Sequence, residues 1–195
     1  MILSGEKLPG TRLVLHDLEQ ELKIGRGPIR EALMRLDRSG IIKNIPYKGA
    51  IVASPPSFKE IVSIFEVRMK LEVQLAVEAL QNLDKRKIKQ LEKLHKEMEE
   101  IKPDFYTTDR KFHDIIYQAA NQSYIYMIVQ KLIQTVEAYL TLYRQNTEDC
   151  KVFNQDHQSI LDAIKDKDQD ALTEHLTRNI ERGLQVIEKT YHRLS

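Results

Sequence analysis

Apolar residues recur at helical spacing along most of the chain, with one short interruption near the N-terminus. Leu13, Leu18 and Leu22 follow the interval of an amphipathic helix. The run Gly25-Arg26-Gly27-Pro28 then breaks the chain and places Pro28 in the first turn of a second helix, where proline is favoured. That helix is predicted to run to about Ser39, with Gly40 ending it.

Two short apolar stretches follow, residues 41–45 and 49–53, on either side of Pro46-Tyr47-Lys48. They predict a small β-hairpin. Consecutive prolines in Ser54-Pro55-Pro56-Ser57 then block helix continuation, and a serine suits the cap of the next helix. We therefore predict a winged helix-turn-helix domain over residues 1–53, a linker at 54–57 and a helical domain over 58–195.

Beyond residue 57 the apolar spacing is helical nearly everywhere. About six helices and no strands are predicted, so the fold class is mainly α, with an all-α bundle after the winged helix. The breaks between the helices fall near residues 82–84, Pro103, Asn121, 146–149 and 165–168.

Composition and the absence of long apolar runs indicate the cellular compartment of the protein. The single cysteine, Cys150, excludes an internal disulfide and a Cys-x-x-Cys zinc site, which indicates a reducing environment. No apolar run approaches the roughly 18 residues of a membrane span, and the charged opening segment is unlike a signal peptide. A cytoplasmic protein without a membrane partner is predicted.

The charge pattern points to a local basic patch, because the net charge is only +1. Residues 1–53 contain nine basic and six acidic residues. Arg26 and Arg30 project together from the start of the second predicted helix, which also carries Arg35 and Arg38. In helix-turn-helix docking this end enters the major groove. A solvated helix face with no partner is the alternative.

The first 53 residues resemble the GntR family of winged-helix repressors. The matching segments are Leu8-Pro9-Gly10-Thr11-Arg12-Leu13, the run from Ile24 to Leu36 with its Arg-x-Pro-x-Arg-Glu-Ala-Leu pattern, Gly40-Ile41-Ile42, and Tyr47-Lys48-Gly49-Ala50-Ile51-Val52. The resemblance implies binding to double-stranded, palindromic operator DNA. The DNA-binding residues it implies are Arg26, Gly27, Arg30, Arg35, and Lys48 with Gly49 at the tip of the wing.

Two positions depart from the family pattern. Gly25 stands where the family has Ser or Thr, which removes a hydroxyl that can cap the helix and touch phosphate. The family also has a further helix before Ile2, and this chain begins at its last turn. We therefore expect a truncated first helix.

The helical domain places polar residues at angles where apolar ones are expected, although unpartnered burial costs a few kcal/mol. Asp109 and His113 lie one turn apart and could share one ion. Arg68 and Glu72 lie four apart, either as an ordinary ion pair or as a site for an anionic ligand. The other such residues are His157, Asn179 and, nearer the edge of its stripe, His175.

Imidazole and carboxylate ligands suit a divalent metal such as zinc, nickel or manganese. The alternative is a set of core histidines that bond to the backbone. Segments of residues 58–190 resemble the FCD sensor domain of the FadR subfamily: Arg68-x3-Glu72, Asp109-x2-Phe112-His113, and His157-x2-Ile160-x3-Ile164-x3-Asp168. Many such domains hold a metal through one Asp and three His, and a small carboxylate effector completes the coordination.

By that resemblance Asp109, His113 and His157 are metal ligands, and Arg68 anchors the effector carboxylate. Asn179 takes the place of the third histidine, with His175 as the alternative fourth ligand. The chain is thus predicted to be a homodimeric repressor controlled by a small organic acid. One alternative keeps the fold but makes the bundle only a dimerisation module. A metal-dependent bundle enzyme is disfavoured, because the one Glu-x-x-His motif, Glu92 to His95, turns Glu92 away from the core.

Overall fold

The fold comes from a computed structural model that describes residues 1–2, 6–38, 40–46, 48–54, 56–100, 105–143 and 147–194. Side chains are described outside 137–149 and 190–195. The chain divides into two compact units. One holds residues 1–59 and 131–144, and the other holds residues 60–130 and 145–195.

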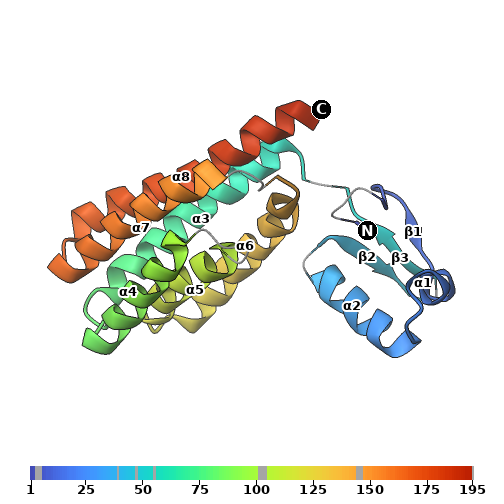
Figure 1. Cartoon of the computed structure of the whole chain (residues 1–195), viewed down its shortest axis with the longest axis horizontal. Coiled ribbons are helices and arrows are strands. Elements are labelled where there is room, and N and C mark those ends of the chain that lie inside the picture. Colours follow the sequence, from blue (N-terminus) through green and yellow to red (C-terminus); the bar gives the residue numbers. More distant parts are fainter. Residues whose placement is uncertain are drawn as a thin grey trace. The chain divides into compact units, whose positions relative to one another are not determined.

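The first unit follows the winged-helix order. The elements are β1 (Arg12–Leu13), α1 (Leu15–Leu22), α2 (Arg26–Arg38), β2 (Ile42–Ile45) and β3 (Gly49–Val52). The three strands form an antiparallel sheet in the order β1-β3-β2, with Arg12 opposite Ile51 and Ile42 opposite Val52. The wing is the hairpin of β2 and β3, seen beside α2 in Figure 1.

A small apolar core holds this unit together. Its buried residues are Leu13, Leu18, Ile29, Leu33, Ile41, Ile42, Ala50 and Val52. Beside it lies an apolar groove of about 270 Å³, where Leu22 and Ile24 remain 41% and 46% exposed.

At the wing, a glycine is required for two reasons. Gly49 has φ +90°, and a Cβ there would stand 2.3 Å from the backbone oxygen of Leu13. The Arg12 side chain also holds the turn, donating from Nε and Nη2 to the Lys48 carbonyl at 3.1 and 3.0 Å.

Six helices follow in the described residues, and they belong chiefly to the second unit, except for the half of the fourth helix from Lys131 onward (Figure 1). They are α3 (Phe58–Ala79), α4 (Lys85–Glu99), α5 (Phe105–Gln118), α6 (Ser123–Tyr143), α7 (Thr147–Asp166) and α8 (Gln169–Leu194). Asp84 caps α4 by accepting the Lys87 backbone N–H at 2.8 Å. Asp168 accepts that of Ala171 at the start of α8 at 2.9 Å. None of the helices in the described ranges could cross a bilayer.

The bundle core is aliphatic with a few aromatic rings. α7 packs on α8 and on α4, and α4 packs on α5. Phe65 of α3 contacts Gly183 of α8, where a Cβ would stand 3.5 Å from the ring. Phe65, Leu91, Phe112, Tyr117 and Ile160 are among the largest fully buried side chains.

The predicted fold class is confirmed, with two local corrections. Leu13 was placed in the first helix, but it lies in β1 and pairs with Ala50. The prediction of a hairpin alone also missed β1, which is too short to show an alternating pattern. Some predicted boundaries fall outside the described residues: Ser39, Tyr47 of the wing, Pro55 of the linker, Pro103 and Asn146.

Candidate functional site

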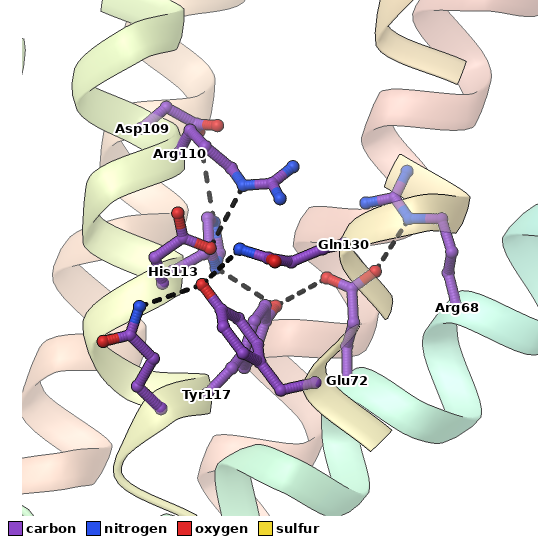
Figure 2. A network of polar contacts seen from close by, with 10 residues as sticks. Arg68, Glu72, Asp109, Arg110, His113, Tyr117 and Gln130 are labelled. Atoms are coloured by element: carbon purple, nitrogen blue, oxygen red, sulfur yellow. Dashed lines mark hydrogen bonds and ion pairs between the residues drawn. The ribbon is translucent and has the colours of Figure 1, made fainter. Parts of the chain in front are cut away.

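A cluster of three metal-ligating side chains lies inside the bundle. Asp109 and His113 project from the same face of α5 because they are four residues apart, and His157 projects toward them from α7. His157 Nε2 lies 3.0 Å from Asp109 Oδ1 and 3.1 Å from His113 Nε2. Both histidines are buried, and Figure 2 shows Asp109 and His113 on neighbouring turns. In the described residues, no fourth His, Cys, Asp or Glu joins this group.

The three donor atoms fit one cation. His113 Nε2 and Asp109 Oδ1 are 4.0 Å apart, which completes a triangle of sides 3.0, 3.1 and 4.0 Å. A point in its plane lies about 2.0 Å from each corner, the usual bond length from zinc to nitrogen or carboxylate oxygen. The set could therefore hold a first-row divalent metal, with further coordination positions open to a ligand.

His113 is held in the neutral form that a metal needs. Burial lowers the pKa of His113 to about 4, and the opposing attraction of Asp109 does not compensate. The ring is therefore uncharged at neutral pH, and no proton has to be removed from it to bind a cation.

A chain of hydrogen bonds leads from His113 to α3. Tyr117 Oη lies 3.3 Å from His113 Nδ1 and donates to Glu72 Oε2 at 2.6 Å. Glu72 Oε1 accepts from Arg68 Nε at 2.7 Å, and the Arg68 guanidinium stacks over the Phe65 ring. Burial, then the neighbouring Glu72 carboxylate, raises the pKa of Tyr117 well above its usual value. Figure 2 shows this chain running from α5 to α3.

An ion-pair cluster around the buried Asp156 links α7 to α8 beside His157. Asp156 Oδ1 accepts from Arg178 Nε at 3.0 Å, and Asp156 Oδ2 accepts from Arg182 Nε at 2.7 Å. Asn179 lies between the two arginines in sequence and is buried, with no hydrogen-bond partner for its Nδ2 among the described residues. His175 is half-buried one turn earlier, and its buried Nδ1 is likewise unpartnered there.

The predicted DNA-reading side chains lie on the surface of the first unit. Arg26 begins α2 and remains 55% exposed although it pairs with Glu19 at 2.8 Å. Arg30 is exposed one turn later, and Arg35 is 75% exposed beside Glu31. A Cβ added at Gly27 would meet no atom within 4 Å, so the helix surface there is open. Lys48 is exposed at the wing.

Sequence reasoning missed several partners of these residues. Tyr117 could have been found, because it follows His113 by four residues on the same face of α5. The Asp156 cluster carried no such signal, because its arginines are more than 20 positions away.

The Glu-x-x-His motif has a structural role. Glu92 pairs with Lys165 at 2.8 Å, and His95 is buried with Nε2 3.2 Å from the Asn154 carbonyl oxygen.

Comparison with known proteins agrees with this architecture. Residues 1–52 match the bacterial regulatory proteins of the gntR family, and residues 63–182 match the FCD domain. The gluconate operon transcriptional repressor of Bacillus licheniformis is 31% identical over 191 residues, which cover 92% of this chain and 77% of that protein. Its namesake in Bacillus subtilis (strain 168) is 30% identical over 192 residues, with the same coverage.

The solved structure of E. coli McbR/YncC has the same fold. It superposes with a TM-score of 0.77 at 21% identity and covers 97% of this chain and 92% of that one. The matched families describe transcription regulators and not enzymes. The two matches together cover most of the sequence, and the chain therefore belongs to the GntR family of bacterial transcription regulators, in the FadR subfamily that carries an FCD domain.

Proposed function

We propose that this chain is a homodimeric cytoplasmic repressor whose affinity for a palindromic operator is controlled by a small carboxylate. The carboxylate binds near a divalent metal, zinc, nickel or manganese, inside the bundle. The winged helix is the DNA-binding domain, residues 54–57 are the linker and residues 58–195 form the sensing and dimerisation domain. The observation that carries the sensing role is the convergence of Asp109, His113 and His157 on one point.

The exposed start of α2 supports the DNA-reading role. Arg26 and Arg30 stand on one side of its first turns, and Arg35 and Gly27 lie on the same helix. An arginine there can bond guanine bidentately or hold phosphate. Lys48 and Gly49 supply the second contact through the wing. In the proposed homodimer, two winged-helix domains about one DNA turn apart would match the two half-sites of a palindrome.

Binding to DNA flanking the gene, followed by fluorescence anisotropy across a salt series, tests this role. Arg30→Ala should lose about 1–3 kcal/mol on the specific site and relax its selectivity. Arg38→Ala is the matched control, because it removes the same charge from the far end of α2. It should weaken specific and nonspecific binding alike. Equal selectivity in the two variants would remove Arg30 from the reading surface.

The proposed metal site has Asp109, His113 and His157 as ligands and a fourth, weaker candidate. Asn179 is the fourth ligand in this proposal, through its amide oxygen, with His175 as the alternative. The Asp156 cluster favours Asn179, because Arg178 and Arg182 hold that turn of α8 beside the residue that precedes His157. An amide oxygen binds more weakly than imidazole, so metal affinity should be modest.

Arg68 is the proposed anchor for the effector carboxylate. Its Nε is engaged by Glu72, while in the described residues no hydrogen bond engages its two terminal nitrogens. A guanidinium that keeps two donors can bind a carboxylate bidentately. The side chain is 11% exposed, so a carboxylate that reached it would lie in a partly dehydrated setting.

Metal content and ligand response test the sensing role together. His157→Ala should abolish zinc, nickel and manganese binding, whereas His95→Gln, which changes a buried histidine bonded to backbone, should not. Gluconate is the first effector probe, since the Bacillus relatives are repressors of the gluconate operon. Glucitol, which lacks the carboxylate, is its control.

The alternative, a bundle that only dimerises, makes a different prediction. DNA release by gluconate or another small acid would then survive changes at Asp109, His113 and His157. A response lost in all three variants, with the dimer intact by sedimentation, would exclude it.

A further inference from the structure

We infer that Glu72 and Tyr117 are positioning residues that fix the ring tautomer of His113, so that its Nε2 carries the lone pair directed at the metal. This inference rests on the proposed metal site. It adds a role for two buried residues that are not among the proposed ligands, and it links the metal site to Arg68 on α3.

The contacts form an unbranched chain across two helices. Arg68 Nε donates to Glu72 Oε1 at 2.7 Å, and Glu72 Oε2 accepts from Tyr117 Oη at 2.6 Å. Tyr117 Oη is 3.3 Å from His113 Nδ1. Glu72 is 2% exposed and Tyr117 is fully buried, so no bulk water competes for these bonds.

The direction of each bond follows from which groups can donate. A guanidinium only donates and a carboxylate only accepts, so both carboxylate oxygens of Glu72 receive protons. Tyr117 has a single hydroxyl proton, and the short bond to Glu72 uses it. The Tyr117 oxygen then faces His113 as an acceptor. Since one of the two must donate, the proton between them lies on His113 Nδ1.

The consequence falls on the other ring nitrogen. A neutral imidazole holds one proton, so a proton on Nδ1 leaves Nε2 as the bare donor atom. His113 Nε2 is the atom that faces Asp109 and His157. A partner behind a ligating histidine orients the ring and raises its basicity, and loss of such a partner typically lowers metal affinity about 10- to 100-fold.

Glu72→Gln gives the sharpest test, because Arg68 dictates how the amide must turn. The amide oxygen faces the arginine, which can only donate, so the NH₂ group faces Tyr117. The hydroxyl then accepts from the amide and gives its proton to His113 Nδ1. His113 keeps its own proton on Nε2, where it blocks the metal.

The readout is the tautomer of His113 in the metal-free full chain, from long-range ¹H–¹⁵N correlation spectra, with His113→Gln assigning the signal. We expect the Nδ1–H form in the unaltered protein, the Nε2–H form in Glu72→Gln and a mixture in Tyr117→Phe. Zinc affinity, measured by competition with a chromophoric chelator, should fall about 10- to 100-fold in both variants.

Tyr126→Phe is the matched control. This tyrosine also carries a hydrogen-bonded hydroxyl, which accepts from Gln118 at 3.0 Å and from Gln130 at 2.6 Å, and neither bond involves His113. It should change neither readout. If Tyr117 only filled space, Tyr117→Phe would behave like Tyr126→Phe, and an unchanged tautomer in folded Glu72→Gln and Tyr117→Phe would overturn the inference.

The two readouts separate this inference from the proposed function. A tautomer that responds as expected in a protein that binds no zinc, nickel or manganese would overturn the metal site while leaving the hydrogen-bond chain established. Tight metal binding that both variants retain, with an unchanged tautomer, would leave the metal site standing and overturn the positioning role.

Discussion

Asp156→Asn should destabilise the bundle by about 2 kcal/mol. The substitution keeps the shape of a side chain that is only 3% exposed and removes its charge. The amide has one accepting oxygen. At that oxygen the bonds from Arg178 Nε and Arg182 Nη2 lose the carboxylate charge, each worth roughly 1 kcal/mol less, and the NH₂ group in the place of Oδ2 cannot accept from Arg182 Nε, so that bond is lost. The full difference is not expected, because the arginines are 42% and 31% exposed and remain hydrated.

Urea unfolding followed by tyrosine fluorescence measures this effect. The chain has no tryptophan, and seven of its eight tyrosines come after residue 100, so the signal reports chiefly on the helical part. Asp162→Asn is the control: it makes the same change on α7 at an exposed site and should stay within about 0.5 kcal/mol. A loss below about 0.5 kcal/mol in Asp156→Asn, with an unchanged slope, would refute the view that this cluster holds α7 to α8.

The remaining predictions concern the wing, the reading helix and pH. Gly49→Ala should unfold or loosen the first unit, by about 2–4 kcal/mol, because it combines a positive φ with a backbone clash; thermal melts and proteolysis would detect this. Gly27→Ala should leave the melt unchanged or raise it slightly, since nothing lies within 4 Å, yet weaken DNA binding in anisotropy assays if the DNA backbone passes there. The folded-state pKa of His113, about 4, lies below the unfolded value near 6.5, so the unfolded chain gains a proton first as pH falls. Stability of the metal-free protein should therefore drop by about 2 kcal/mol from pH 7 to pH 5, and chelator-treated His113→Gln should lack that part of the loss in urea midpoints.

The sequence was informative wherever a local rule decides the structure. The helix limits around Asn121 and Asp168 follow from turn residues and caps, and both are seen, with Asn121 at φ +58°. The pairing of Asp109 with His113 follows from helical periodicity alone. These features depend on neighbours within four residues, which a single sequence reveals.

Features that depend on the register between helices distant in sequence could not be predicted from the sequence. His157 was expected in the core, but its 3.0 Å approach to Asp109 depends on how α7 sits against α5. An ion pair between Arg68 and Glu72 is one of the two alternatives that the sequence offers, and it is observed, while the second bond of Glu72, to Tyr117, spans 45 positions. The strand β1 exists only because β3 offers it an edge, and its two residues carry no pattern of their own.

If the wing contacts DNA as proposed, the bond from Arg12 to the Lys48 carbonyl should affect the kinetics of DNA recognition. Two donors from one guanidinium hold the turn of the wing in the free protein. Freezing a backbone residue costs about 1–2 kcal/mol, and here that loss of entropy occurs when the unit folds. In the proposed complex, a wing that is already ordered would bind DNA without a search among loop conformations. Arg12→Lys would keep the positive charge but replace the two donor nitrogens of the planar guanidinium by one, so we expect a less ordered wing in the free protein.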